Sequence, residues 1–238
     1  MGSPVSGPSP VPIAAETCLG LVLGRAPAAE VRRHLGYPAH AVPKTRIAAR
    51  IEDVGEAAAA VLQPRGAYAV HVVTAQTPHR IDADGAAIRG EVSRFVGTVD
   101  RVAVVVATAG AEISELAERY GSAGDSLGAW IADAIGSWAA EAAADAVTDR
   151  LRAYVGPGEA LTLRYSPGYC GMAMAQQRVL FGLVQAQTAG ITLLPSMLMR
   201  PLKSVSGIVG FGPIGERGAD APATPCAACG RVACHMRR

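Results

Sequence analysis

Hydrophobic residues recur along the chain with two spacings, one typical of helices and the other of strands. Between Lys44 and Leu62 apolar residues return every three or four positions, which predicts an amphipathic helix. Residues 102–107 form a continuous apolar run rich in valine, which indicates a buried strand. Asp84-Gly85 is typical of a hairpin turn. The expected helices are residues 28–38, 44–62, 111–121, 126–152 and 172–183; the expected strands are residues 17–24, 67–75, 102–107, 161–164, 191–194 and 204–211, with the hairpin over 79–90.

The order of these elements indicates the fold class. Helices and strands alternate only loosely, and a hairpin joins two of the strands. The pattern therefore favours an α+β fold, with a mixed or antiparallel sheet, one long helix and flanking helices, over a doubly wound parallel sheet. We expect residues 1–15, rich in proline and small polar residues, to be disordered. Residues 16–213 are expected to form the α+β domain, and residues 214–238 a linker with a cysteine-rich tail.

The longest expected helix, residues 126–152, carries polar and aromatic residues on one face. Trp130, Ala134, Trp138, Glu141 and Asp145 fall within about 80° of one another at roughly 100° per residue. In one interpretation the two acids only fringe a buried stripe and meet solvent. In the other, Glu141 points at a ligand from a partly buried position, where an unpaired carboxylate would be costly.

Composition excludes several classes of protein. The chain has 238 residues, of which 50% are hydrophobic, so it can bury a sizeable core. The net charge is only +2 and there are two lysines, Lys44 and Lys203, which leaves no basic stripe for nucleic acid. No apolar run reaches the roughly 20 residues of a membrane-spanning helix, and the N-terminus has no secretory signal pattern. The five cysteines are an odd number, which argues against a secreted disulfide framework and predicts a cytoplasmic protein.

The segment RYSPGY, residues 164–169, is the first candidate for ligand binding. Arg164 can hold a carboxylate through two parallel hydrogen bonds. Pro167-Gly168 forms a turn that exposes backbone polar groups, and Tyr169 adds a ring and a hydroxyl. Alternatively, the same six residues form a structural turn around an arginine that is already paired within the protein.

Further motifs follow this segment in order: GITLLPS at residues 190–196 and MRPLKSVSGIVGFGP at residues 199–213. Together with RYSPGY they resemble the activation domain of cobalamin-dependent methionine synthase, and more closely its free-standing bacterial relatives. The likeness extends over residues 28–213. It implies S-adenosylmethionine binding, with an arginine on the methionyl carboxylate and a glutamate of the long helix beside the cofactor. The residues that the resemblance implies are Glu141, Arg164, Ser166, Gly168, Tyr169, Ser206 and Gly207.

The resemblance also implies a function. Such a domain rescues inactive corrinoid, because one-electron reduction of cobalt(II) is coupled to methyl transfer from S-adenosylmethionine. The implied partners are a corrinoid-binding domain or protein that holds the cobalamin, a methyltransferase subunit, and an electron donor such as flavodoxin. The chain is then a component of methionine synthase activity and not a complete enzyme. It departs from the family pattern in three places: Cys170 replaces a proline, no tyrosine follows Gly207, and no position matches an early aspartate ligand of the family.

The C-terminal cysteines are a second candidate site. Cys226, Cys229 and Cys234 have a spacing that suits zinc or an iron–sulfur cluster. A fourth ligand would come from His235, Cys170 or Cys18, or the three are free thiols on a tail. The rival hypothesis is accordingly a metal or iron–sulfur redox or docking protein for a corrinoid methyltransferase, without S-adenosylmethionine binding.

Overall fold

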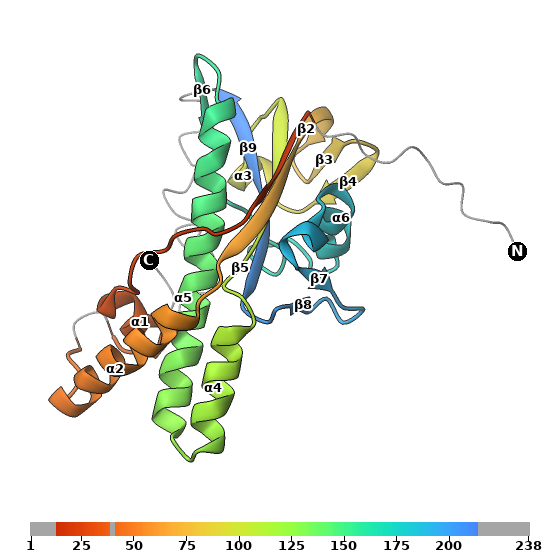
Figure 1. Ribbon diagram of the computed structural model, residues 1–238. Coiled ribbons are helices and arrows are strands. Elements are labelled where there is room, and N and C mark those ends of the chain that lie inside the picture. The colour runs from red at the N-terminus through yellow and green to blue at the C-terminus, as the bar shows by residue number, and fades with distance from the viewer. Residues whose placement is uncertain (1–12, 39–40, 214–238) are drawn as a thin grey trace, which may run out of the picture.

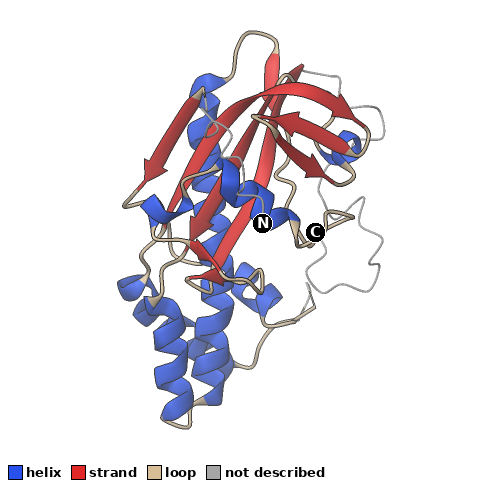
Figure 2. Ribbon diagram, turned by 90° about the vertical axis from the view of Figure 1, so that its right-hand side faces the viewer, coloured by secondary structure: helices blue, strands red, loops and turns tan. Residues whose placement is uncertain are grey.

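The computed structural model describes residues 13–38 and 41–213, and these form a curled sheet with helices on both of its faces (Figures 1 and 2). The strands are β1 (Ala14–Cys18), β2 (Arg65–Thr77), β3 (Arg80–Ala83), β4 (Ala86–Arg89), β5 (Arg101–Thr108), β6 (Glu159–Leu161), β7 (Thr192–Leu193), β8 (Met199–Arg200) and β9 (Ser204–Pro213). The helices are α1 (Ala28–His34), α2 (Thr45–Val61), α3 (Val92–Phe95), α4 (Glu112–Ser122), α5 (Ser126–Arg150) and α6 (Gln176–Leu183), with short 3₁₀ helices η1 (Leu151–Tyr154) and η2 (Ala186–Ala189).

The main sheet has seven strands, and all of its described pairings are antiparallel. Its order is β4-β3-β2-β5-β9-β6, and β1 also pairs with the first part of β2. Residues 65–72 of the long strand β2 pair with β5 and residues 73–77 pair with β3, with a register shift between Val73 and Ala75 in the second pairing. The α+β fold with an antiparallel sheet and a long helix is thus confirmed.

Strand β5 lies at the centre of the sheet and explains its two covered faces. Val104 and Val106 belong to the same buried cluster as Leu180 of α6. Val105 faces the other way and packs in a cluster with Val147 of α5. Because successive side chains of a strand point to opposite faces, a continuous apolar run is buried on both sides. This is the arrangement that the run at residues 102–107 predicted.

Helix α5 connects the sheet to a helical subassembly. Its buried residues are mostly alanine and glycine, so neighbouring elements approach its backbone closely. The C-terminal half covers the sheet, while α1, α2 and α4 pack around the N-terminal half (Figure 1). Asp125 caps the start of α5 by accepting a hydrogen bond from the Gly128 N–H at 2.8 Å. No helix within the described ranges is long and apolar enough to cross a membrane.

Several boundaries differ from the sequence-based expectations. The strand expected at residues 161–164 lies earlier, as β6 at Glu159–Leu161, and the helix expected at residues 28–38 ends at His34. The first strand is β1 at Ala14–Cys18 and not residues 17–24, because Gly20 adopts a left-handed backbone conformation (φ 61°) that ends it. Residues 14 and 15, which were expected to be disordered, therefore lie in a strand. Residues 1–12 and the tail from residue 214 fall outside the described residues.

Two further helix boundaries also differ. The helix expected from residue 172 begins only at Gln176, after a left-handed turn at Cys170 and Gly171. The long helix ends at Arg150 and continues as η1.

Candidate functional site

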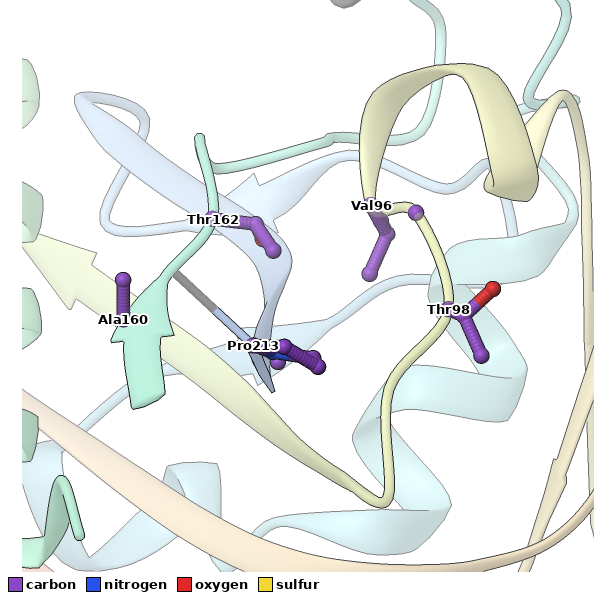
Figure 3. A pocket seen from close by; sticks show the side chains of 7 residues that line it. Val96, Thr98, Ala160, Thr162 and Pro213 are labelled. Atoms are coloured by element: carbon purple, nitrogen blue, oxygen red, sulfur yellow. The ribbon is translucent and has the colours of Figure 1, made fainter. Parts of the chain in front are cut away.

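A shallow depression lies near the end of β9, and it is separate from the residues that the sequence singled out. Its lining consists of residues 96–98, 160, 162, 212 and 213 (Figure 3). This lining is small and uncharged and includes none of the predicted ligand-binding residues. The predicted ligand-binding residues gather instead around Arg164.

Arg164 follows β6, and its guanidinium joins this part of the sheet to α5. Nη2 donates to Glu141 Oε2, and Nη1 donates to Asp145 Oδ1 over 2.8 Å. The side chain of Arg164 is only 13% exposed, whereas those of Glu141 and Asp145 are 41% and 68% exposed. Two carboxylates one helical turn apart thus hold a mostly buried cation. Glu141 and Asp145 share a helical face, as their spacing predicted. Trp130 is 55% exposed, so it does not contribute to a buried stripe on that face.

Gly207 of β9 lies beneath Arg164, in close contact with it. A Cβ at this position would lie 2.7 Å from Arg164 Cγ, 2.7 Å from Ser166 Oγ and 3.0 Å from the Tyr165 carbonyl oxygen. Real Cβ atoms do not come within 3.0 Å of a neighbour, so a larger residue at this position would require Arg164 and Ser166 to shift. The structure therefore brings Gly207 next to Arg164 and Ser166, two predicted site residues that lie about 40 positions earlier in the sequence.

The segment from Tyr165 to Met172 forms a tight loop that follows Arg164 directly in the chain. Tyr165 and Ile208 exchange two backbone hydrogen bonds, of 2.9 and 2.8 Å. The pairing stops there, and Pro167, which has no N–H, cannot continue the ladder. Gly168 takes a left-handed conformation (φ 88°), and its N–H donates to the Met172 carbonyl at 2.8 Å. The loop leaves Tyr169 61% exposed at the surface.

Ser206 lies on the other face of the sheet from the Arg164 cluster. It precedes Gly207 in β9, and successive residues of a strand point to opposite faces. Ser206 is only 3% exposed, and its Oγ has no hydrogen-bond partner within the described part of the chain. A contact between Ser206 and a ligand at Arg164 would have to involve its backbone, so its role stays a prediction.

Sequence reasoning missed a second cation next to α5. Lys203 Nζ lies 2.7 Å from Asp133 Oδ1 and donates to Ser137 Oγ at 2.9 Å, and its side chain is 13% exposed. Asp133, Ser137, Glu141 and Asp145 follow one another at four-residue spacing, so they form one polar ridge along the helix. That spacing, together with the scarcity of lysine in the chain, was the signal that could have identified Lys203.

The charges of the Arg164 cluster define what it can bind. Arg164, Glu141 and Asp145 sum to one net negative charge, and residues 165–175 carry no charged side chain. The carboxylate of an α-amino acid suits the guanidinium, and its ammonium suits a carboxylate. A further positive charge on the same ligand would be attracted by the second carboxylate. The residues present therefore fit an amino-acid group that carries an additional cation.

The described residues include no group of three or more His, Cys, Asp or Glu side chains arranged to hold a metal ion. The predicted metal ligands Cys226, Cys229 and Cys234 lie outside the described residues, and so does His235. Of the other two proposed ligands, Cys18 is buried and Cys170 is partly buried. The zinc or iron–sulfur site at the tail therefore stays a prediction.

Comparison with protein families decides the assignment of the chain. Residues 65–215 match the family described as the activation domain of vitamin B12-dependent methionine synthase. The chain belongs to this family. The matched residues of this activation domain include α5, the loop after Arg164 and β9. They therefore include every residue of the candidate site. The family that the ordered motifs predicted is confirmed.

A solved structure confirms the activation-domain fold. The chain is similar to the crystal structure of the MetH reactivation domain bound to AdoHcy, with a TM-score of 0.63 and 19% sequence identity. The likeness covers 86% of this chain and 81% of that one. At this identity it concerns the fold and not the individual contacts. No curated protein matches the chain at the sequence level.

Proposed function

We propose that this activation domain binds S-adenosylmethionine and thereby reactivates a cobalamin-dependent methyltransferase of the methionine synthase type. The observation that carries the proposal is the cluster of Arg164, Glu141 and Asp145 over Gly207. S-adenosylmethionine has a carboxylate, an ammonium and a sulfonium, which is the combination of charges that this cluster suits. The similar reactivation domain bound to AdoHcy, which differs from S-adenosylmethionine by one methyl group, supports the choice of ligand.

Each residue of the site would contact a different group of S-adenosylmethionine. Arg164 would take the methionyl carboxylate while it keeps one of its two partners on α5. Glu141 would then be released toward the ammonium, and Asp145 would contribute negative potential near the sulfonium. The backbone of the loop at Ser166 and Gly168 and the exposed ring of Tyr169 would contact the remainder of the ligand. Gly207 would provide the close approach that this arrangement needs.

The task of the domain would be one of orientation. S-adenosylmethionine supplies the methyl group, and cobalamin on a partner chain accepts it together with one electron. The residues of this domain bind the donor and present its sulfonium to the docked partner, and no side chain has to act as a general acid or base. We infer a corrinoid-binding domain or protein, a methyltransferase subunit and an electron donor such as flavodoxin as partners, in the cytoplasm.

The experiment for this proposal follows the cob(II)alamin spectrum of a corrinoid-binding methionine synthase fragment. With S-adenosylmethionine and reduced flavodoxin present, addition of this protein should accelerate the loss of the cob(II)alamin absorption. Glu141→Gln should slow the reaction, while Glu56→Gln, an exposed glutamate on α2, should not. If the rate is the same with and without the protein, the proposal is wrong.

The tail motif supports a second candidate function. If Cys226, Cys229 and Cys234 hold zinc or an iron–sulfur cluster, the protein would be a redox or docking component that acts without S-adenosylmethionine. Metal analysis and a visible spectrum of anaerobically purified protein would test this candidate. Stoichiometric iron, together with no binding of S-adenosylmethionine, would favour it over the first proposal.

A further inference from the structure

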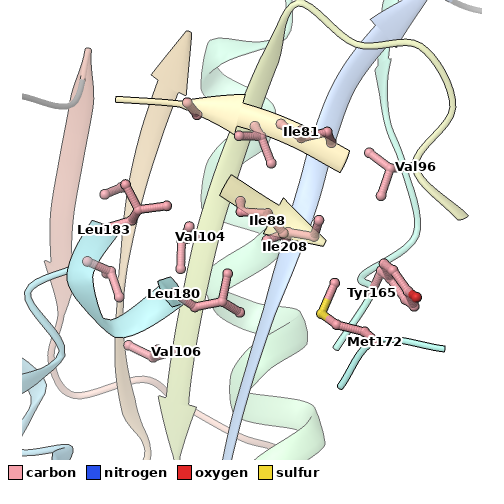
Figure 4. Packing of buried hydrophobic residues seen from close by; sticks show 14 of the residues in the cluster. Ile81, Ile88, Val96, Val104, Val106, Tyr165, Met172, Leu180, Leu183 and Ile208 are labelled. Carbon is pink, nitrogen blue, oxygen red and sulfur yellow. The ribbon is translucent and has the colours of Figure 1, made fainter. Parts of the chain in front are cut away.

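Tyr165 lies beneath the loop that follows Arg164, and its hydroxyl joins two separate segments. The residue is only 2% exposed, and its ring stacks on Phe95 with centroids 4.7 Å apart and planes 13° apart (Figure 4 shows Tyr165 within the core cluster). The Tyr165 Oη accepts a hydrogen bond from the Glu91 N–H at 3.0 Å and donates one to the Cys170 carbonyl at 2.9 Å. The hydroxyl thus connects the start of α3 to the far end of the loop.

The residue that Tyr165 holds is in an unfavourable backbone conformation. Cys170 has φ 45°, which is rare for a residue other than glycine, asparagine or aspartate, and Gly171 after it has φ 90°. Such a conformation persists only where its surroundings impose it. Within the loop, the Met172 N–H donates to the Tyr169 carbonyl at 2.9 Å. The bond from Tyr165 to the Cys170 carbonyl is an additional constraint, and it comes from the core.

The packing around the hydroxyl leaves little room for another arrangement. A Cβ on Gly90 would lie 2.7 Å from Tyr165 Oη, and a Cβ on Gly171 would lie 3.0 Å from Glu91 Cγ. Glycine at positions 90 and 171 therefore lets the two segments approach Tyr165 and Glu91. Burial raises the pKa of Tyr165 above its ordinary value, so the hydroxyl keeps its proton and remains a donor at neutral pH.

We propose that Tyr165 is a positioning residue that fixes the loop of residues 166–171 in the conformation that binds the ligand. The ligand part of this inference rests on the proposed function, because it takes the loop as one wall of the S-adenosylmethionine site. Tyr165 itself packs in the core and is only 2% exposed. Its ring is held by Phe95, so the hydroxyl is the group that acts on the loop.

The test compares Tyr165→Phe with Tyr68→Phe. Tyr68 is an equally buried tyrosine, 1% exposed, and its hydroxyl also makes two hydrogen bonds, to Glu16 and to Tyr154. Each substitution removes one buried hydroxyl and leaves the ring in place. Amide hydrogen exchange is measured without ligand, and the affinity for S-adenosylmethionine is measured by calorimetry. A purely structural tyrosine would change only the melting temperature.

Tyr165→Phe should accelerate exchange at the amides of Gly168, Tyr169 and Met172 about 5–10-fold, while the amides of β5 stay protected. The same variant should bind S-adenosylmethionine about 5–10-fold more weakly, and Tyr68→Phe should bind it like the wild type. If the loop amides of Tyr165→Phe exchange at the wild-type rate, Tyr165 does not position the loop, regardless of which ligand the protein binds. If the wild-type protein does not bind S-adenosylmethionine, the proposed function fails, and the ligand part of this inference fails with it. The exchange rates then still decide whether Tyr165 fixes the loop.

Discussion

Replacement of Gly207 by alanine tests whether the close approach of β9 to Arg164 matters. The added methyl would lie 2.7 Å from Arg164 Cγ and 2.7 Å from Ser166 Oγ, and both of these side chains can turn aside. The Tyr165 carbonyl oxygen, 3.0 Å away, cannot move so easily, because it accepts the Ile208 N–H at 2.8 Å. Overpacking of this kind costs about 1–3 kcal/mol of unfolding free energy. For a domain of this size, each kcal/mol lowers the melting temperature by about 2–4 °C.

The ligand affinity should fall as well, because a displaced Arg164 loses its partners on α5. We expect Gly207→Ala to bind S-adenosylmethionine at least about 10-fold more weakly, which corresponds to one charge-assisted hydrogen bond. Thermal unfolding and calorimetric titration measure the two effects. The matched control is Gly182→Ala in α6, where a Cβ meets nothing within 4 Å, so the helix should gain about 0.5–1 kcal/mol. A Gly207→Ala protein that melts and binds like the wild type would refute this reasoning.

Two further predictions concern charge. Asp145→Asn should reduce the preference for S-adenosylmethionine over S-adenosylhomocysteine about 2–5-fold, because the lost charge is exposed and acts through a high dielectric constant; equal ratios in competitive titrations would contradict the role of Asp145. The pKa of Asp125 is lowered, first by the Gly128 N–H that it accepts and then by Arg50. A lowered carboxyl pKa stabilises the fold above the ordinary value of about 4, and this contribution is lost as the pH falls through the lower, folded-state pKa. Asp125→Asn keeps an N-cap acceptor but does not titrate. Denaturant titrations should therefore show that this variant loses less unfolding free energy than the wild type between about pH 5 and 2. An equal loss would contradict the contribution of Asp125 to acid sensitivity.

The local elements could be predicted because their signals are short-range. The valine run of β5 and the Asp84-Gly85 turn fix their own conformation, and in the structure both residues of the turn have positive φ, 46° and 75°. The strand β1 could not be placed from its own residues. Its position depends on pairing with residues 66–70 of β2, about 50 positions later in the chain.

The candidate site could be predicted only in part, for a similar reason. Helical spacing identified Glu141, but the partner of Asp145 is an arginine 19 positions away, which only the folded chain brings near. The hydroxyl of Tyr165 acts through residues 91 and 170, and no local pattern marks that role. Ser206 and Gly207 are neighbours in one strand, and the sequence pattern does not distinguish their roles, but the pleat turns them to opposite faces.

The most direct test of the central claim is a calorimetric titration of the wild type, Arg164→Ala and Arg50→Ala with S-adenosylmethionine. Arg50 is a matched control because it also forms a partly buried ion pair, with Asp125 at the far end of α5. The wild type and Arg50→Ala should bind alike. Arg164→Ala should bind about 10–150-fold more weakly, because a charge-assisted pair contributes about 1.5–3 kcal/mol. A wild type that does not bind at millimolar ligand, or an Arg164→Ala protein that binds equally well, would contradict the account.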